Sequence, residues 1–250
     1  RLVGVPADFV APMRVGHESH PLSRAAARAF GLPEGVPVVG PYIDHEAGYM
    51  GVAGRGAGEA PVQCSLGTAW VGNFVAPAGP PPPGGVNLVL PSPVGPGNMI
   101  IRVMPAGNLT WDHALTTFVG GRNPLPRAER VFAERLLPPV GLVGLPWHTQ
   151  RNLFDADAVG GGAFLGVSTH TTAGDLLRST VLGMCCQFAH LFAAVRAERV
   201  VLTGGASRGR FFRTILAGLF APTPVFFLDD ELFGVRGSVR PLADAQWTCG

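Results

Sequence analysis

Residues 199–228 read RVVLTGGASRGRFFRTILAGLFAPTPVFFL, and this stretch decides the fold. The apolar, β-branched run at 199–202 is typical of a buried strand, and a glycine-containing turn at 203–209 follows it. Residues 211–220 have the apolar content of a helix, and the run at 225–228 predicts a second strand. A strand, a turn, a helix and a strand in this order form a βαβ unit, which indicates a layered α/β fold.

A long helix is the clearest element outside this unit. Residues 172–196 place apolar side chains such as Leu177, Val181 and Phe188 at helical spacing, and Thr171 or Thr172 can cap the start. The pattern also predicts strands at 36–40, 61–66, 69–75, 86–90, 99–104 and 141–145, and helices that begin within 41–54 and cover 109–119 and 124–137. Loops are expected at 79–85 and 147–162, with an apolar segment at 163–168.

Composition excludes several classes of protein. The 250 residues are 47% hydrophobic and 14% charged, which suits one large or two small folded domains and excludes a disordered chain. The net charge of +2 comes without a Lys/Arg stripe, so we expect no nucleic-acid partner. No apolar run approaches the roughly 20 residues that cross a bilayer, so we expect no membrane association. Four cysteines without CxxC spacing favour a cytoplasmic protein over a zinc or disulfide scaffold.

Asp44 is the first candidate for chemistry. It follows the predicted strand at 36–40 and precedes a predicted helix, so it reads either as a general base that removes a hydroxyl proton or as a helix N-cap. His45 follows it directly. Since His17, His20 and His45 offer no convincing set of three ligands, no metal site built from protein side chains is predicted.

Two glycine-containing segments could hold phosphate groups. In residues 64–68, CSLGT, glycine permits close approach of an anion and the hydroxyl groups can bind its oxygens, although a plain hairpin turn explains the segment equally well. In residues 202–207, LTGGAS, two glycines lie between a strand and a helix. A nucleotide could lie against that backbone, or the segment could be a simple entry into the helix.

Taken together and in order, these segments resemble the C-terminal half of FGGY-family carbohydrate kinases, over residues of about 31–245. The strand, the acid and the Ala-rich helix of that family are matched by residues 36–54, and its SLGTS motif by residues 65–69, SLGTA. The family's G-x-L-x-W segment is similar to residues 107–111, GNLTW, and its RGxFxGL segment with the long helix after it to residues 160–192. The adenosine motif is similar to residues 200–220, with Ala206 where many members have a third glycine.

The resemblance implies roles for single residues. Asp44 would be the catalytic base in ATP-dependent phosphorylation of a sugar or polyol hydroxyl, with His45 beside the substrate. The remaining implied positions would bind ATP and Mg²⁺: Gly67 and Thr68 at the transferring phosphate, Gly107 near the nucleotide, Gly204, Gly205 and Ala206 at the adenosine, and Arg210 close by. The fold implied is the ribonuclease H-like, actin-type ATPase fold, here as a C-terminal lobe with a mixed sheet flanked by helices.

The same resemblance implies a missing lobe. The family's N-terminal phosphate loop has no counterpart in these residues, and the chain begins at Arg1, so we expect a fragment or a processed chain. Residues 1–35 would connect to the missing lobe, and 36–250 would be the nucleotide-binding lobe. The isolated chain is expected to be inactive and to associate through its uncovered apolar face, for example as a homodimer. The alternative is a non-catalytic module of actin-like fold that binds a nucleotide or a partner.

Overall fold

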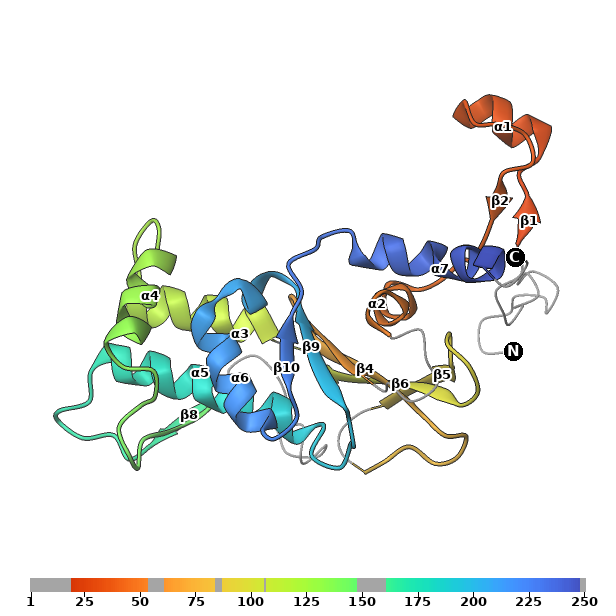
Figure 1. Cartoon of the computed structure of the whole chain (residues 1–250). Helices are drawn as coiled ribbons and strands as arrows, with labels where there is room; N and C mark the ends of the chain where they lie inside the picture. Colours follow the sequence, from red (N-terminus) through yellow and green to blue (C-terminus); the bar gives the residue numbers. More distant parts are fainter. Residues whose placement is uncertain (1–18, 54–60, 84–86, 106, 148–160, 248–250) are drawn as a thin grey trace, which may run out of the picture.

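A six-stranded mixed sheet forms the centre of the molecule (Figure 1). The computed structural model describes residues 19–53, 61–83, 87–105, 107–147 and 161–247. The strand order is β10-β9-β3-β4-β6-β5; β10, β9 and β3 run parallel, and the other neighbours pair antiparallel. The strands span Pro61–Leu66 (β3), Trp70–Ala76 (β4), Asn87–Pro91 (β5), Asn98–Met104 (β6), Arg199–Thr203 (β9) and Val225–Phe227 (β10).

Helices cover both faces of this sheet, as the sequence predicts (Figure 1). They span Arg24–Phe30 (α1), Asp44–Val52 (α2), Gly107–Ala114 (α3), Leu125–Glu134 (α4), Ala173–His190 (α5), Arg210–Phe220 (α6) and Phe233–Trp247 (α7). Because strand side chains alternate in direction, β3 sends Val62, Cys64 and Leu66 into the larger core, which it shares with α3, α4, α5 and α6. A smaller core on the opposite face contains Tyr49 of α2 and Met99 of β6.

Aromatic rings fill the larger core around Trp70, which is fully buried. Its ring lies edge-on to Phe188 of α5, at 5.5 Å between centroids, and to Phe212 of α6, at 5.2 Å. The edge of one aromatic ring is electropositive and the face of another electronegative, so these contacts add to the free energy gained from burial. Trp70 therefore holds β4 and two helices together.

The βαβ prediction is confirmed: β9, α6 and β10 lie within one residue of the predicted bounds, and the two strands are parallel neighbours. The long helix is confirmed at its start, where Thr172 caps α5. It ends at His190 rather than 196, because the chain turns there and places Phe192 in the core against Gly72. The remaining sheet strands agree with the prediction within one residue.

Other predicted elements are present with different bounds or in a different setting. Strand 36–40 is reduced to Pro37–Val38 (β2), which pairs with His20–Pro21 (β1) in a separate exposed sheet, so Asp44 does not follow a buried strand. Helix 109–119 divides into α3 and a π-helix at Leu115–Val119, and α4 ends at Glu134, before residue 137. Strand 141–145 is Val143–Leu145 (β7), paired with Ala163–Leu165 (β8). Residues 148–160 of the predicted loop lie outside the described residues.

Helix α7 was not predicted, because Gly234, Gly237 and Pro241 are all poor helix formers. Tertiary packing stabilises it instead. The backbone of α2 lies so close that a Cβ atom on Gly237 would overlap the Ala47 carbonyl group. Arg240 also donates hydrogen bonds to the carbonyl oxygens of Met50 and Ala53, where its charge complements the C-terminal end of α2. No helix in the described residues is long and apolar enough to cross a membrane.

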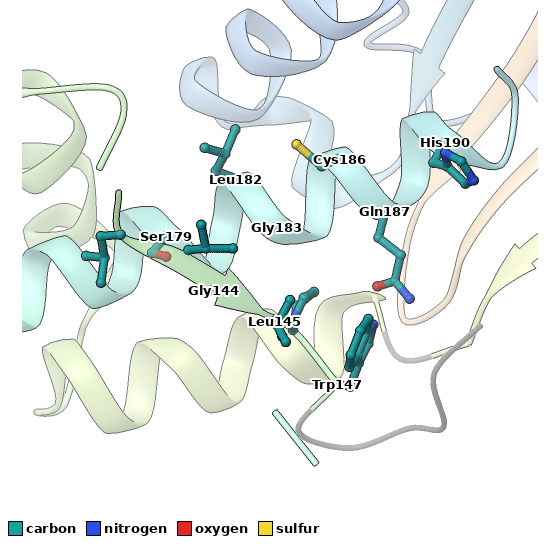
Figure 2. A pocket seen from close by; sticks show the side chains of 12 residues that line it. Gly144, Leu145, Trp147, Ser179, Leu182, Gly183, Cys186, Gln187 and His190 are labelled. Atoms are coloured by element: carbon teal, nitrogen blue, oxygen red, sulfur yellow. The ribbon is translucent and has the colours of Figure 1, made fainter. Parts of the chain in front are cut away.

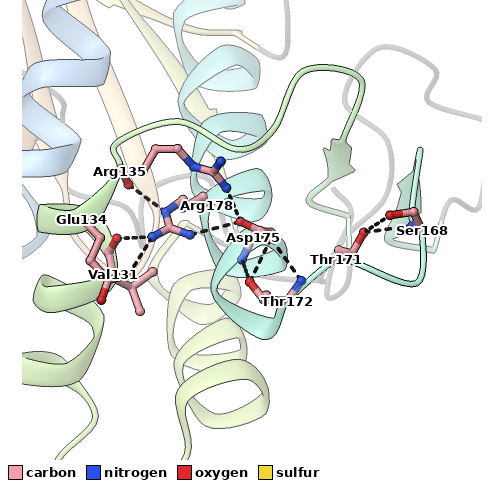
Figure 3. Close-up of polar contacts among 8 residues, drawn as sticks. All are labelled: Val131, Glu134, Arg135, Ser168, Thr171, Thr172, Asp175 and Arg178. Carbon is pink, nitrogen blue, oxygen red and sulfur yellow. Dashed lines mark hydrogen bonds and ion pairs between the residues drawn. The ribbon is translucent and has the colours of Figure 1, made fainter.

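A buried charge cluster anchors the start of α5 to the end of α4 (Figure 3). The Asp175 carboxylate accepts hydrogen bonds from the Thr172 amide at 3.1 Å and from Arg178 at 3.1 Å, and forms an ion pair with Arg135. The buried Arg178 also donates to the carbonyl oxygens of Arg135, at 2.7 Å, and Val131. Burial alone would raise the pKa of Asp175, but the hydrogen bonds from Thr172 and the charge of Arg135 hold it below its ordinary value of 3.8.

We expect Asp175→Asn to lower the free energy of unfolding by about 1–3 kcal/mol at neutral pH, because the buried Arg178 then keeps only the exposed Glu134, at 3.5 Å, as a carboxylate partner. The stabilisation from a carboxyl whose folded pKa is depressed is present above pH 3.8 and is lost as the pH falls through the folded pKa. The difference between the variant and the wild type should therefore shrink in acid. Urea titrations of both proteins, at neutral pH and at a pH below 3.8, measure this difference in the free energy of unfolding.

The control is Glu34→Gln, which removes the exposed Arg24–Glu34 ion pair. It should change the free energy of unfolding by less than about 0.5 kcal/mol. Equal losses in the two variants would contradict a special role for the buried cluster.

Candidate functional site

Three turns meet at one end of the central sheet. Strands β3 and β9 are parallel neighbours with Ser65 opposite Thr203, so both end at the same edge. The turn at 67–69 follows β3, and Gly204 and Gly205 follow β9 and lead into a short 3₁₀-helix, η3, at Gly205–Arg208. Strand β6 ends at the same edge, with Met104 opposite Trp70, and α3 begins there at Gly107.

Gly204 lies directly against the end of β3. Its φ is +86°, and a Cβ atom would lie 3.0 Å from the backbone nitrogen and carbon of Leu66 and 3.1 Å from its carbonyl oxygen. Both the left-handed backbone and the close contact favour glycine here. The turn after β9 is therefore seated on the backbone that leads into Gly67.

The start of α3 is joined to the turn after β3. The backbone N–H of Asn108 donates to the Thr68 carbonyl oxygen at 3.0 Å, and its side-chain oxygen accepts from the Trp70 indole N–H at 3.0 Å. Gly107 packs so closely on the Trp70 ring that a Cβ atom would overlap it. The structure thus brings together Gly67, Thr68, Gly107, Gly204 and Gly205, and we call these five residues the glycine cluster.

Two cavities flank the turn after β9. One, of about 340 Å³, is lined by Gly204, Gly205, Phe233 and the acidic residues 229–231. A Cβ atom on Gly205 would meet no atom within 4 Å, so this backbone faces open space. The other, of about 400 Å³, lies between α4 and α6 and includes Arg210 and Phe211. Ala206 packs against the larger core instead.

Arg208 borders both cavities and carries two exposed ion pairs. Its guanidinium group donates to Glu231 at 2.6 Å and to Asp229 at 3.3 Å. The hydrogen bond to Glu231 is the main reason that the pKa of Arg208 is raised. These contacts tie η3 to the segment before α7, where Asp230 accepts from the Leu232 amide at 2.9 Å.

Asp44 is exposed and is the first residue of α2. Ile43 takes the N-cap position, which was one of the two interpretations of Asp44, and the Asp44 carboxylate accepts from the His45 amide at 3.0 Å. Within the described ranges, Asp44 forms no ion pair. A contact through Phe233 links α2 to the glycine cluster, because this ring lines the 340 Å³ cavity and lies 3.3 Å from where a Cβ atom on Gly48 would be.

A buried polar row beneath the glycine cluster was missed by sequence reasoning. Gln63 donates to the Thr203 hydroxyl at 3.0 Å and accepts from Asn73, and Thr203 donates to the Cys64 carbonyl oxygen at 3.2 Å. All three side chains are almost fully buried. Hydrogen bonds pair the polar side-chain atoms of this row except the Asn73 Oδ1, so the row fixes β3, β4 and β9 side by side. The sequence does carry a signal for this row, because Gln63, Asn73 and Thr203 are polar residues within mostly apolar strands.

The geometry suits an anion with an attached organic group. Open backbone at Gly205, the exposed Thr68 and the start of the eight-residue helix α3 lie at one edge, and helix N-termini attract negative charge. Among the described residues, no group of three or more His, Cys, Asp or Glu side chains is placed to hold a metal ion.

Comparisons with solved structures show which known proteins have a similar fold. No protein-family model matches the chain, and no curated protein sequence matches it. Among solved structures, a xylulose kinase from Rhodospirillum rubrum is similar with a TM-score of 0.82 and 22% identity, over 97% of this chain and 49% of that one. A gluconate kinase from Lactobacillus acidophilus gives 0.73 and 15%, over 92% and 47%.

A glycerol kinase from Plasmodium falciparum, solved with ADP, has a TM-score of 0.71 and 12% identity, over 90% of this chain and 45% of that one. The chain therefore has a fold found in these kinases. It spans about half of their length.

We expect Gly204→Ala to lower the free energy of unfolding by about 1–3 kcal/mol, since it forces a Cβ atom against the Leu66 backbone at a positive φ. Gly205→Ala is the matched control. With no atom within 4 Å of its Cβ position, it should stay within about 0.5 kcal/mol of the wild type. Urea unfolding followed by tryptophan fluorescence measures both, and equal stability of the two variants would contradict the close packing.

Proposed function

We propose that this chain is the nucleotide-binding lobe of an ATP-dependent kinase that phosphorylates a hydroxyl group of a sugar or polyol. The main support for this proposal is that the five residues of the glycine cluster lie together at one edge of the sheet. Its members come from three separate segments, which are the ones that resemble FGGY-family motifs, and the similar folds belong to xylulose, gluconate and glycerol kinases. We assign the chain to this family and to the ribonuclease H-like, actin-type fold.

ATP would bind across the turn after β9. In this arrangement the adenosine would contact Gly204 and Gly205, with Arg210 at the neighbouring cavity, whereas Ala206 packs against the larger core. The phosphates extend toward Gly67 and Thr68, beside Gly107 at the positive end of α3. Mg²⁺, when bound with the nucleotide, neutralises charge on the transferring phosphoryl group. The residues of the chain supply positioning, which is the main catalytic requirement of this chemistry.

Asp44 would accept the proton of the acceptor hydroxyl. A general base must be accessible to its substrate, and this carboxylate is exposed, forms no ion pair in the described residues and lies on the first residue of α2. His45 would contact the substrate beside it. A second lobe would supply the remaining sugar contacts and exclude water when the two lobes close.

The nucleotide site is tested by calorimetric titration of the 250-residue chain with Mg·ATP. We expect saturable binding that Gly205→Arg weakens by about tenfold or more, because the new side chain fills the cavity that Gly205 faces. The control is Gly218→Arg, the same substitution at an exposed glycine of α6 with no atom near its Cβ position. A folded wild-type chain that does not bind Mg·ATP, or equal affinity in the two variants, would contradict the site.

The base is tested in a two-lobed protein that includes this chain. Asp44→Asn should lower kcat by about 10²–10⁴-fold, the usual contribution of a general base, and leave the Kd for ATP unchanged, because the base acts on the acceptor hydroxyl. Asp112→Asn, at an exposed carboxylate of α3, is the matched control and should keep full activity. Unchanged turnover in Asp44→Asn would remove this residue from the mechanism. Mg·ATP binding without turnover in the wild type would favour a nucleotide-binding module.

A further inference from the structure

A further cavity lies between β7 and α5, away from the glycine cluster (Figure 2). Its volume is about 510 Å³, within the range of small-molecule sites, and it shares no lining residue with the two cavities beside the turn after β9. Most of its wall is apolar, with Leu145, Pro146, Trp147 and Leu182 among the lining residues.

Two glycines fix the shape of this cavity. A Cβ atom on Gly144 of β7 would lie 2.7 Å from the Ser179 carbonyl oxygen, and one on Gly183 of α5 would overlap the Gly144 carbonyl. The strand therefore lies directly on the helix backbone. Close backbone packing of this kind gives the cavity rigid walls, so it is formed before a ligand arrives.

Polar atoms without partners face this cavity. Gln187 is 4% exposed and Ser179 is 1% exposed, yet both atoms of the Gln187 amide and the Ser179 hydroxyl lack a hydrogen-bond partner. The indole N–H of Trp147 is buried and unpartnered as well. In Figure 2 the Gln187 side chain extends from α5 toward the Trp147 ring. Buried polar groups are almost always hydrogen-bonded, so these atoms indicate a missing partner.

The character of the lining limits what that partner can be. None of the described residues that line the cavity is Asp, Glu, Lys or Arg, which favours an uncharged ligand. An amide such as that of Gln187 has a donor and an acceptor side by side and pairs with a planar edge that carries the complementary two groups. The Trp147 ring and the apolar wall provide area for a flat apolar body.

We propose that this cavity is a second binding site, for an uncharged aromatic lactam or a similar planar heterocycle whose adjacent N–H and C=O pair with the Gln187 amide. The apolar body of the ligand packs against Trp147 and Leu182. The Ser179 hydroxyl and the Trp147 N–H bind any further polar atom on the ligand. This site is independent of the proposed kinase activity.

The test compares two probes, 2-quinolone and N-methyl-2-quinolone, by calorimetric titration. The second keeps the flat body and the carbonyl group but lacks the N–H donor. The wild-type chain should bind 2-quinolone at least about tenfold more tightly than its N-methyl form. In Gln187→Leu, which replaces the amide with an apolar side chain of similar size, the two affinities should become equal. Gly205→Arg should bind both probes as the wild type does, because the two sites are separate.

A second readout locates the site. Cys186 lines the cavity and is exposed, whereas Cys64 and Cys185 are buried. Burial of part of its side chain raises the pKa of Cys186, so alkylation with iodoacetamide is run near about pH 9, where more thiolate is present. Peptide mass analysis should show that 2-quinolone slows modification of Cys186. No saturable binding, equal wild-type affinity for the two probes, or unchanged Cys186 labelling at saturation would each overturn the proposal.

Discussion

The parallel pairing of β3 with β9 is the interaction on which the candidate site depends. It places Pro61–Ser65 opposite Arg199–Thr203, although these residues are about 140 positions apart in the sequence. A slip of one residue would turn Cys64 and Leu202 from the larger core to the opposite face, which hydrophobic burial opposes. Gln63 and Thr203 fix the same register through a buried hydrogen bond of 3.0 Å. Because the register is fixed, the two turns at the ends of these strands meet.

Glycines then determine how closely backbones can approach. At the glycine cluster, Gly204 lies on the Leu66 backbone and Gly107 on the Trp70 ring. Glycine allows the same close backbone packing between α7 and α2 at Gly237, and between β7 and α5 at Gly183. In each place a Cβ atom would separate two elements that carry functional or structural groups. Gly205 is different because a Cβ atom there would meet no atom within 4 Å, and open space of this kind leaves the backbone accessible to a ligand.

Periodicity predicted the elements whose apolar pattern is local. The βαβ unit and α5 are examples, since both combine apolar runs with a turn or a cap that is visible in the sequence. Periodicity failed where tertiary contacts determine the secondary structure. Residues 36–40 have the apolar pattern of a buried strand, but only Pro37–Val38 forms a strand, and it is exposed in a two-stranded sheet. Helix α7 contains poor helix formers and is stabilised by its contact with α2. The motifs indicated which residues would meet, whereas the buried Gln63 and the unpartnered Gln187 required the structure.

The location of Asp44 fits a site that two lobes complete. Its carboxylate is exposed, at the start of a helix on the sheet face opposite α5, and contact with the glycine cluster runs through Phe233 rather than directly. An exposed carboxylate is hydrated, and water competes with the substrate for its hydrogen bonds. Closure of a second lobe would remove that water only when both substrates are bound. In the proposed two-lobed kinase, this arrangement would couple proton transfer to closure and would limit hydrolysis of ATP by solvent.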